Sequence, residues 1–139
     1  MATFNKFNSF VEALAEKVHN LGSDQLKAAL SNTLPVATNT VLANVTQVSV
    51  GNGYVSGGIT LTTASSAQTS GTYKLTISDA TLTASGGAIG PFQYVVLYND
   101  TAANDELIGW YDYGVPLTLT SGNSFTIDFD GVNGVLTIT

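Results

Sequence analysis

Short apolar runs separated by glycine-rich turns fill the chain from residue 23 to its end, and this pattern is the strongest constraint on the fold. Apolar and polar side chains alternate in Tyr73–Ser78, and the alternation recurs in Phe125–Phe129. A strand with one face on a core and the other in water has this period of two. Turn signals such as Gly51–Gly53 and Asp130–Gly131 separate the runs without an intervening helical pattern. The pattern therefore predicts antiparallel sheets.

We predict nine or ten short strands in this part of the chain. They are Asp24–Asn32, Val45–Val50, Ile59–Ala64, Tyr73–Ser78, Ala80–Ala84, Phe92–Asn99, Leu107–Tyr113, Leu117–Thr120, Phe125–Phe129 and Val135–Ile138. The first of these segments also tolerates a helix. Phe92–Asn99 and Leu107–Tyr113 are apolar on both faces, so we expect a hairpin with the core on one side and a helix or a partner on the other. For 139 residues the predicted fold is a single mainly β domain, an antiparallel, jelly-roll-like β-sandwich.

One helical pattern precedes the strands. Its apolar residues, spaced alternately three and four apart, are Phe4, Phe7, Val11, Leu14, Val18 and Leu21. Ser9 followed by Glu12 fits a capping box at the start of the regular helix, with Phe4–Asn8 as an arm or an earlier turn before it, and Gly22 fits its end. We therefore predict an amphipathic α-helical arm over residues 1–22 and a β-sandwich body over residues 23–139. The apolar stripe is expected to pack on its own sheet or on a neighbouring subunit.

The charge balance narrows the classes of partner. Only 10% of the residues are charged, the four cations are all lysines, and the net charge is −6. Residues 1–31 are neutral overall, so the remaining residues carry the whole excess. An acidic chain without arginine is a poor match for nucleic acid, and no apolar run reaches the roughly 18 residues that a membrane span needs. We expect neither partner, and the residues after Met1 lack the layout of a secretory signal, which predicts synthesis in the cytoplasm.

Few residues of the chain suit catalysis. The sequence has no cysteine and a single histidine, His19, which we expect in the last turn of the helix, where the helix dipole favours a cation. Asp128 and Asp130 fall on one face of a predicted strand, about 7 Å apart by strand rise, and a glycosidase pair is the alternative to ordinary surface acids. We predict no catalytic residue, no cofactor and no enzymatic activity.

Oxygen ligands that suit calcium gather at two predicted turns. The first turn holds Asp100, Asn104, Asp105 and Glu106, and the second holds Asp128, Asp130 and Asn133. The glycine of Asp128–Gly131 comes too early for an EF-hand loop, and the closing glutamate is absent. Structural calcium stays an alternative to our prediction that the chain holds no metal.

Aromatic residues concentrate near residue 110. Trp110, Tyr111 and Tyr113 surround Asp112 and offer a platform on which sugar rings stack, although strand alternation splits the set between two faces. Burial in the core or at a subunit contact is the alternative that we favour for Trp110 and Tyr111.

The order of several segments resembles a family of small virion proteins of tailed bacteriophages. The segments are Val18–Asp24, Gln25–Lys27, Gly51–Tyr54, Gly57–Gly58, Tyr94–Asn99 and Leu107–Trp110. Together they span most of the chain, but they are turns and core strands rather than catalytic motifs. Ala28–Ser31 departs from the family pattern, in which an aromatic residue tends to follow, and this weakens the strand prediction there.

The resemblance implies a head decoration or cement protein on the capsid exterior, with the major capsid protein as its partner and a homo-oligomer, a dimer or trimer, as its state. A carbohydrate-binding adhesin module on a tail or fibre is the alternative. We expect the partner interface to use the helical stripe and two aromatic residues. These residues are Phe4, Phe7, Val11, Leu14, Val18, Trp110 and Tyr111.

Overall fold

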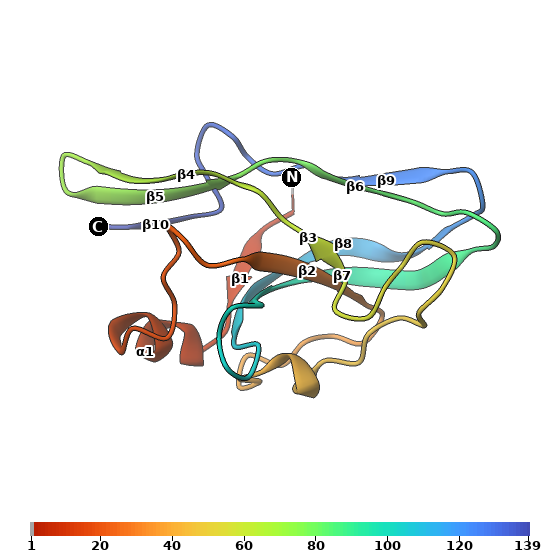
Figure 1. Cartoon of the computed structure of the whole chain (residues 1–139), viewed down its shortest axis with the longest axis horizontal. Helices are drawn as coiled ribbons and strands as arrows, with labels where there is room; N and C mark the ends of the chain where they lie inside the picture. The colour runs from red at the N-terminus through yellow and green to blue at the C-terminus, as the bar shows by residue number, and fades with distance from the viewer. Residues whose placement is uncertain (1) are drawn as a thin grey trace.

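The chain folds into two layers of antiparallel strands, with one short helix and a long loop beside the first layer (Figure 1). A computed structural model describes residues 2–139. The mainly β, antiparallel class that the sequence predicts is confirmed. The two layers stack in a sandwich-like arrangement, and the main apolar core lies between them.

The first layer is a five-stranded sheet built around one long hairpin. Its order is β1 (Phe4–Lys6), β8 (Leu107–Leu119), β7 (Ile89–Asn99), β2 (Leu26–Ser31) and β3 (Ile59–Thr60). The predicted hairpin is confirmed, because β7 and β8 pair antiparallel. β8 is longer than expected and runs through Gly114 and Pro116, because irregularities in its register with β7 let those residues bulge outward.

The second layer consists of two small sheets that lie end to end across the first (Figure 1). One sheet has the order β10 (Leu136–Ile138), β5 (Thr72–Ile77) and β4 (Thr63–Thr69); the other pairs β6 (Ala80–Thr83) with β9 (Ser124–Ile127). Leu75 and Ile77 of β5 point into the core and are buried against the first layer. The alternating pattern thus predicted β5 and its inward face correctly.

The N-terminal segment differs from the predicted helix. Phe4–Lys6 forms β1, which pairs with Gly109–Tyr111, and the helix α1 covers only Ser9–Ala15. The predicted capping box is absent, because the cap residue is Asn8 and its side chain makes no capping bond. Pairing with the edge of β8 satisfies backbone groups that a longer helix would have bonded internally. The residues of the predicted apolar stripe are therefore divided between a strand and a helix.

The helix also ends earlier than Gly22. Lys17 follows the last helical turn with φ of 68°, a left-handed conformation that stops a helix. Phe7 and Phe10 are buried inside the fold. Residues 4–21 are therefore built into the domain as an edge strand, a short helix and a connecting turn.

The outer face of the β7–β8 hairpin is covered by the loop that runs from residue 32 to residue 58 (Figure 1). This loop contains a single 3-10 turn, η1 (Leu42–Asn44), so the strand predicted at Val45–Val50 is wrong. A second apolar cluster fills the space under the loop; its buried members are Phe7, Ala29, Val96, Tyr98 and Leu107. The two apolar faces of the hairpin thus bury against the core on one side and against this loop on the other.

Tyrosine hydroxyls anchor the loop to the sheet. Tyr54 donates to Oε1 of Gln47 at 2.8 Å and accepts from the backbone N–H of Leu30 at 3.1 Å. Tyr98 donates to the carbonyl oxygen of Gly57 at 2.6 Å. The loop keeps its irregular shape because its buried polar groups find partners without a strand ladder.

Candidate functional site

Three exposed apolar side chains lie on adjoining segments and form what we call the α1–loop face. They are Val11 of α1 and Leu34 and Val36 of the loop after β2, with exposed fractions of 51%, 59% and 56%. The backbone N–H of Asn8 donates to the carbonyl of Ala37 at 2.9 Å, which holds the loop against the start of α1. Single exposed apolar residues are ordinary, and these three are grouped here as a candidate surface because the two segments that carry them are joined by this bond.

The structure places only part of the predicted interface stripe at the surface. Val11 and Val18 are exposed. Phe4 and Leu14 are half-buried and pack against the main core. Phe7 is fully buried, so it does not reach a partner in the folded chain. The stripe is divided because the chain turns between β1 and α1, and Leu34 and Val36 take the place of its buried members at the surface.

Trp110 and Tyr111 lie on opposite faces of β8, as strand alternation requires. The ring of Trp110 packs on Phe7 under the loop, with the centroids 4.7 Å apart. Tyr111 faces the second layer, with its ring centroid 5.6 Å from Phe4 and 6.2 Å from Phe129. These two residues therefore contribute to different sites rather than to one platform.

An aromatic cleft of about 450 Å³ opens between the two layers beside β8 and β9. Its aromatic walls include Tyr111 and Tyr113 of β8 together with Phe125 and Phe129 from β9 and the turn after it. The rings of Tyr113 and Phe125 meet edge to face with their centroids 5.9 Å apart. Alternation in the sequence predicts that Phe125 and Phe129 face inward. The cleft that they line cannot be predicted from the sequence pattern, because it depends on how the two layers pack.

Hydroxyl groups in the aromatic cleft are free for a ligand. Among residues 2–139, the tyrosine hydroxyls that hydrogen-bond to another protein group are those of Tyr54, Tyr73 and Tyr98. Burial, and then the negative charge of Asp130, raise the pKa of Tyr111 to about 12. The hydroxyl of Tyr111 is therefore protonated at neutral pH and can both donate and accept a hydrogen bond.

The two carboxylates proposed as a catalytic pair do not share a strand. β9 ends at Ile127, before Asp128 and Asp130. The carboxylate of Asp130 accepts from the backbone N–H groups of Val132 at 2.9 Å and Asn133 at 2.7 Å, and the bonds to Asn133 are the largest cause of its lowered pKa. Asp130 thus stabilises a turn at the rim of the aromatic cleft, and both carboxylates line this cleft from the segment after β9 rather than from a strand.

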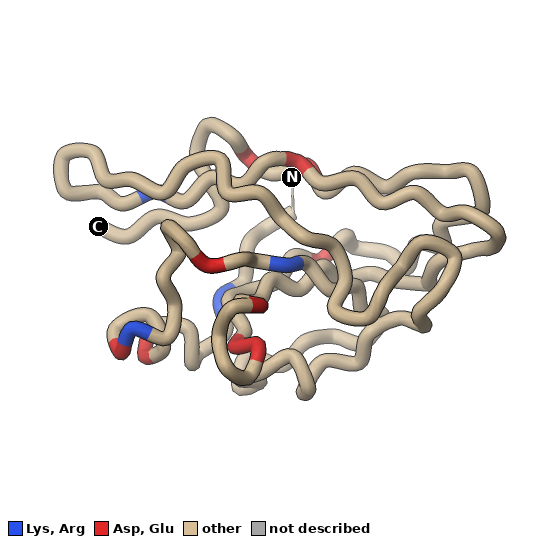
Figure 2. The backbone as a smooth tube through the Cα atoms, in the orientation of Figure 1, with Lys and Arg blue, Asp and Glu red and all other residues tan. Residues whose placement is uncertain are grey.

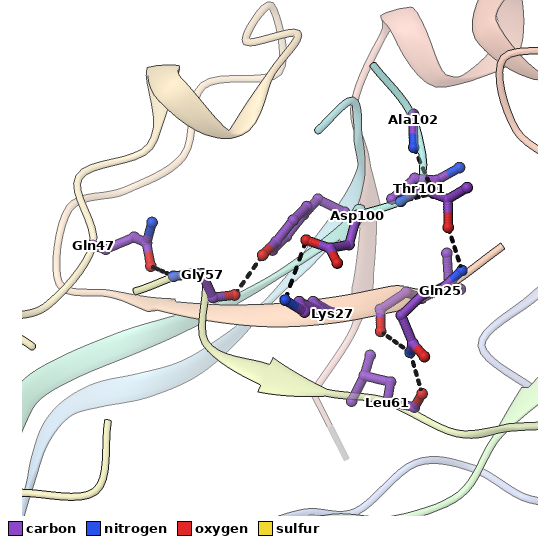
Figure 3. Close-up of polar contacts among 11 residues, drawn as sticks. Gln25, Lys27, Gln47, Gly57, Leu61, Asp100, Thr101 and Ala102 are labelled. Atoms are coloured by element: carbon purple, nitrogen blue, oxygen red, sulfur yellow. Dashed lines mark hydrogen bonds and ion pairs between the residues drawn. The ribbon is translucent and has the colours of Figure 1, made fainter. Parts of the chain in front are cut away.

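The acidic turn between β7 and β8 is held by internal contacts. Asp100 pairs with Nζ of Lys27 on β2 at 3.2 Å, as Figure 3 shows. Glu106 accepts from the backbone N–H and the side-chain amide of Asn104, each at 3.1 Å. Within residues 2–139, no three histidine, aspartate or glutamate side chains are grouped so as to hold a metal ion. The calcium alternative therefore has no cluster of three such side chains in the part of the chain described.

His19 lies in a buried polar cluster and not in the last turn of a helix. Its side chain is only 4% exposed, and its Nδ1 lies 3.1 Å from Nδ2 of Asn99. The amide oxygen of Asn99 accepts from the backbone N–H groups of Thr101 and Ala102, which fixes the amide with its NH₂ group toward the imidazole. Nδ1 must then accept, so the proton of the neutral ring sits on Nε2, a buried atom without a hydrogen-bond partner among residues 2–139.

This arrangement predicts a loss of stability in mild acid. Burial lowers the pKa of His19, and it outweighs the opposing charges of Glu106 and Asp24. The unfolded chain therefore binds a proton more readily than the folded chain. The contribution of the neutral His19 to the free energy of unfolding is fully present above the unfolded pKa of about 6.5. It is lost as the pH falls below that value, by about 1.4 kcal/mol for each unit between the unfolded and the folded pKa.

Urea unfolding between pH 7.5 and pH 5 measures this effect. The free energy of unfolding of the wild-type chain should decrease over that range, and the decrease should be smaller for His19→Gln, which keeps an acceptor for Asn99 but does not titrate. Glu106, with its lowered pKa, affects stability only at lower pH. A wild-type profile that is flat or rises toward pH 5 would refute the assignment.

Among residues 2–139, no helix has both the length and the apolar character needed to cross a bilayer.

Charges are sparse over the chain, and both signs occur on and just after α1 (Figure 2). No protein-family model, no curated protein and no solved structure matches this chain.

Proposed function

We propose that this chain is a non-enzymatic virion structural protein, a capsid decoration or cement protein that binds and stabilises the major capsid protein lattice of a tailed phage. The observation that carries the proposal is the α1–loop face, in which Val11, Leu34 and Val36 are all more than half exposed. The resemblance to small virion proteins supports the phage context. In this proposal a jelly-roll-like sandwich body serves as the rigid support for the face.

The position of the α1–loop face supports docking on a repeating surface. The hydrogen bond between Asn8 and Ala37 holds the helix and the loop together before a partner arrives, so little conformational entropy is lost on binding. Burying an apolar side chain contributes about 1.5–3 kcal/mol, so a three-residue face gives modest affinity for each copy. On a lattice, many copies or linked subunits raise the total occupancy and the resistance of the shell.

The charge distribution also supports docking through the α1–loop face. Residues 1–31 contain three lysines and three carboxylates and residues 32–58 contain no charged side chain, whereas residues 59–139 carry the net charge of −6. A neutral apolar face meets a protein surface without the desolvation of excess charge, and the acidic remainder stays in solvent. We propose that the chain is made in the host cytoplasm and assembles as a dimer or trimer on the capsid exterior.

The test places charges on the α1–loop face. The double variant Val11→Asp with Leu34→Asp should reduce binding to particles assembled without this protein by about ten-fold or more, because two carboxylates would be buried without partners. Both positions are more than half exposed, so the variant should fold like the wild type. Co-sedimentation with the particles and their cryo-EM maps measure occupancy.

The matched control changes exposed valines elsewhere. Val55→Asp with Val132→Asp alters two side chains that are 61% and 78% exposed, outside the α1–loop face, and its occupancy should equal that of the wild type. Equal binding by both double variants would reject the face, and absence of the wild-type chain from mature particles would reject the proposed function.

A further inference from the structure

We propose that the aromatic cleft binds a neutral carbohydrate ring. This inference goes beyond lattice binding, because the cleft borders β8 and β9 and contains no residue of the α1–loop face. Its volume of about 450 Å³ falls within the range of roughly 300–1,000 Å³ that is usual for small-ligand sites. The cleft is therefore large enough for a sugar residue.

The aromatic walls fit the apolar side of a sugar. Tyr113 is 52% exposed, whereas Phe129 is 5% exposed and lies deeper in the cleft. The rings of Tyr111 and Phe129, like those of Tyr113 and Phe125, meet edge to face, so each pair is stabilised internally and its ring positions are preset. A pyranose ring presents C–H groups on one face, and such groups pack on aromatic surfaces.

The polar groups of the aromatic cleft fit the hydroxyls of a sugar. The cleft offers the hydroxyl of Tyr111, which is protonated at neutral pH, that of Tyr113, and the carboxylate of Asp128 at its rim. A tyrosine hydroxyl donates and accepts, and a carboxylate only accepts. Sugar hydroxyls satisfy both kinds of group, whereas an ammonium ion only donates. The combination therefore favours a polyol over a cation.

The charge of the aromatic cleft selects among carbohydrates. Asp128 and Asp130 both line it, and none of the four lysines does. An anionic sugar would meet two like charges in a chain whose net charge is already −6. Neutral glycans should therefore bind better than their sialylated counterparts.

A glycan array with matched neutral and sialylated glycans tests the proposal on the isolated wild-type chain. We expect binding to neutral glycans and binding to the sialylated counterparts that is weaker by about ten-fold. The best neutral glycan is then titrated into ¹⁵N-labelled protein, and the shifted amide resonances should map to β8 and β9.

Variants connect the binding to the aromatic cleft. Tyr113→Ala removes an exposed ring and should weaken binding by about ten-fold, while Tyr111→Phe keeps the ring, removes the hydroxyl and should weaken it by a smaller factor. Val115→Ala is the control, since this residue of β8 is 60% exposed and lies outside the cleft. Its binding should equal that of the wild type, and amide spectra verify that each variant folds.

Four results would overturn the carbohydrate assignment. They are no binding to any glycan, preference for sialylated glycans, equal binding by Tyr113→Ala and the wild type, and resonance shifts in the cleft caused by tetramethylammonium but not by the neutral glycan. Each is measured without phage particles, so failure here is distinguishable from failure of lattice binding, which the α1–loop variants measure separately.

Discussion

Gly58→Ala should destabilise the chain by about 4 kcal/mol or more, a large part of the roughly 5–15 kcal/mol by which domains of this kind are stable. Gly58 precedes β3 and has φ of +84°, a conformation that side chains with a Cβ rarely adopt. A Cβ there would overlap the carbonyl oxygen of Ala28 and lie 2.9 Å from Cα of Ala29. Both contacts are backbone of the central strand β2, which cannot move without disturbing its pairing with β7.

Gly71→Ala separates the cost of the positive φ from the cost of the overlap with β2. Gly71 lies in the turn between β4 and β5 and also has φ of +84°, but a Cβ there would have no neighbour within 4 Å. The control should therefore cost only the backbone strain, about 1–2 kcal/mol. Urea unfolding of both variants gives the comparison. Equal losses would show that Gly58 does not lie against the backbone of Ala28 and Ala29 in β2.

Phe7→Ala should cost about 3–5 kcal/mol, because it removes a large side chain from a packed interior. Phe7 has no exposed surface, and its ring packs on Trp110 with the centroids 4.7 Å apart. The cavity would open between the β7–β8 hairpin and the loop that covers it, where Val96 and Tyr98 also lie. The loss should therefore affect the whole domain rather than a detachable arm.

Val11→Ala is the matched control for Phe7→Ala. Val11 belongs to the same N-terminal segment but is 51% exposed, so its truncation should change the free energy of unfolding by no more than about 0.5 kcal/mol. Chemical unfolding curves of the two variants decide the matter. If Phe7→Ala were as stable as Val11→Ala, the N-terminal segment would not form part of the core.

Local patterns predicted the strands whose own side chains decide their structure. Tyr73–Ser78 alternates strictly, and its first five residues lie in β5 (Thr72–Ile77) with the expected inward face, although Thr76 of the expected wet face is buried as well. Phe92–Asn99 and Leu107–Tyr113 are apolar on both faces, and they form the central hairpin. In these segments propensity, periodicity and burial all favour the same structure.

The two wrong predictions, the helix at Phe4–Lys6 and the strand at Val45–Val50, are explained by contacts that local periodicity does not indicate. The spacing of Phe4, Phe7 and Val11 fits a helix, but the edge of β8 binds Phe4–Lys6 as a strand, which leaves α1 with Ser9–Ala15. Val45–Val50 alternates weakly, yet Gln47 bonds to Tyr54 and Gly57 inside an irregular loop. The partner of Phe4–Lys6 lies on β8, too far along the sequence for a local pattern to reveal it, whereas the partners of Gln47 are side-chain and backbone groups of the same loop that strand alternation does not indicate.

The candidate sites show the same limit. Alternation correctly separated Trp110 from Tyr111, because neighbouring residues of a strand face opposite ways. Phe125 and Phe129 join Tyr111 in the aromatic cleft only because the second layer folds over the first. Leu34 and Val36 join Val11 because a backbone hydrogen bond holds the loop to α1. Both sites depend on the tertiary structure, so their residues could be predicted only in part.

Hydrogen exchange of the native chain, followed by mass spectrometry, tests most directly whether the N-terminal segment is a built-in part of the fold that presents a fixed apolar face. We expect the amides of β1 and the N–H of Phe7, which bonds to the carbonyl of Ile108 at 3.2 Å, to be protected together with β7 and β8. Complete exchange of residues 4–15 at the earliest time, with β7 and β8 still protected, would contradict this expectation.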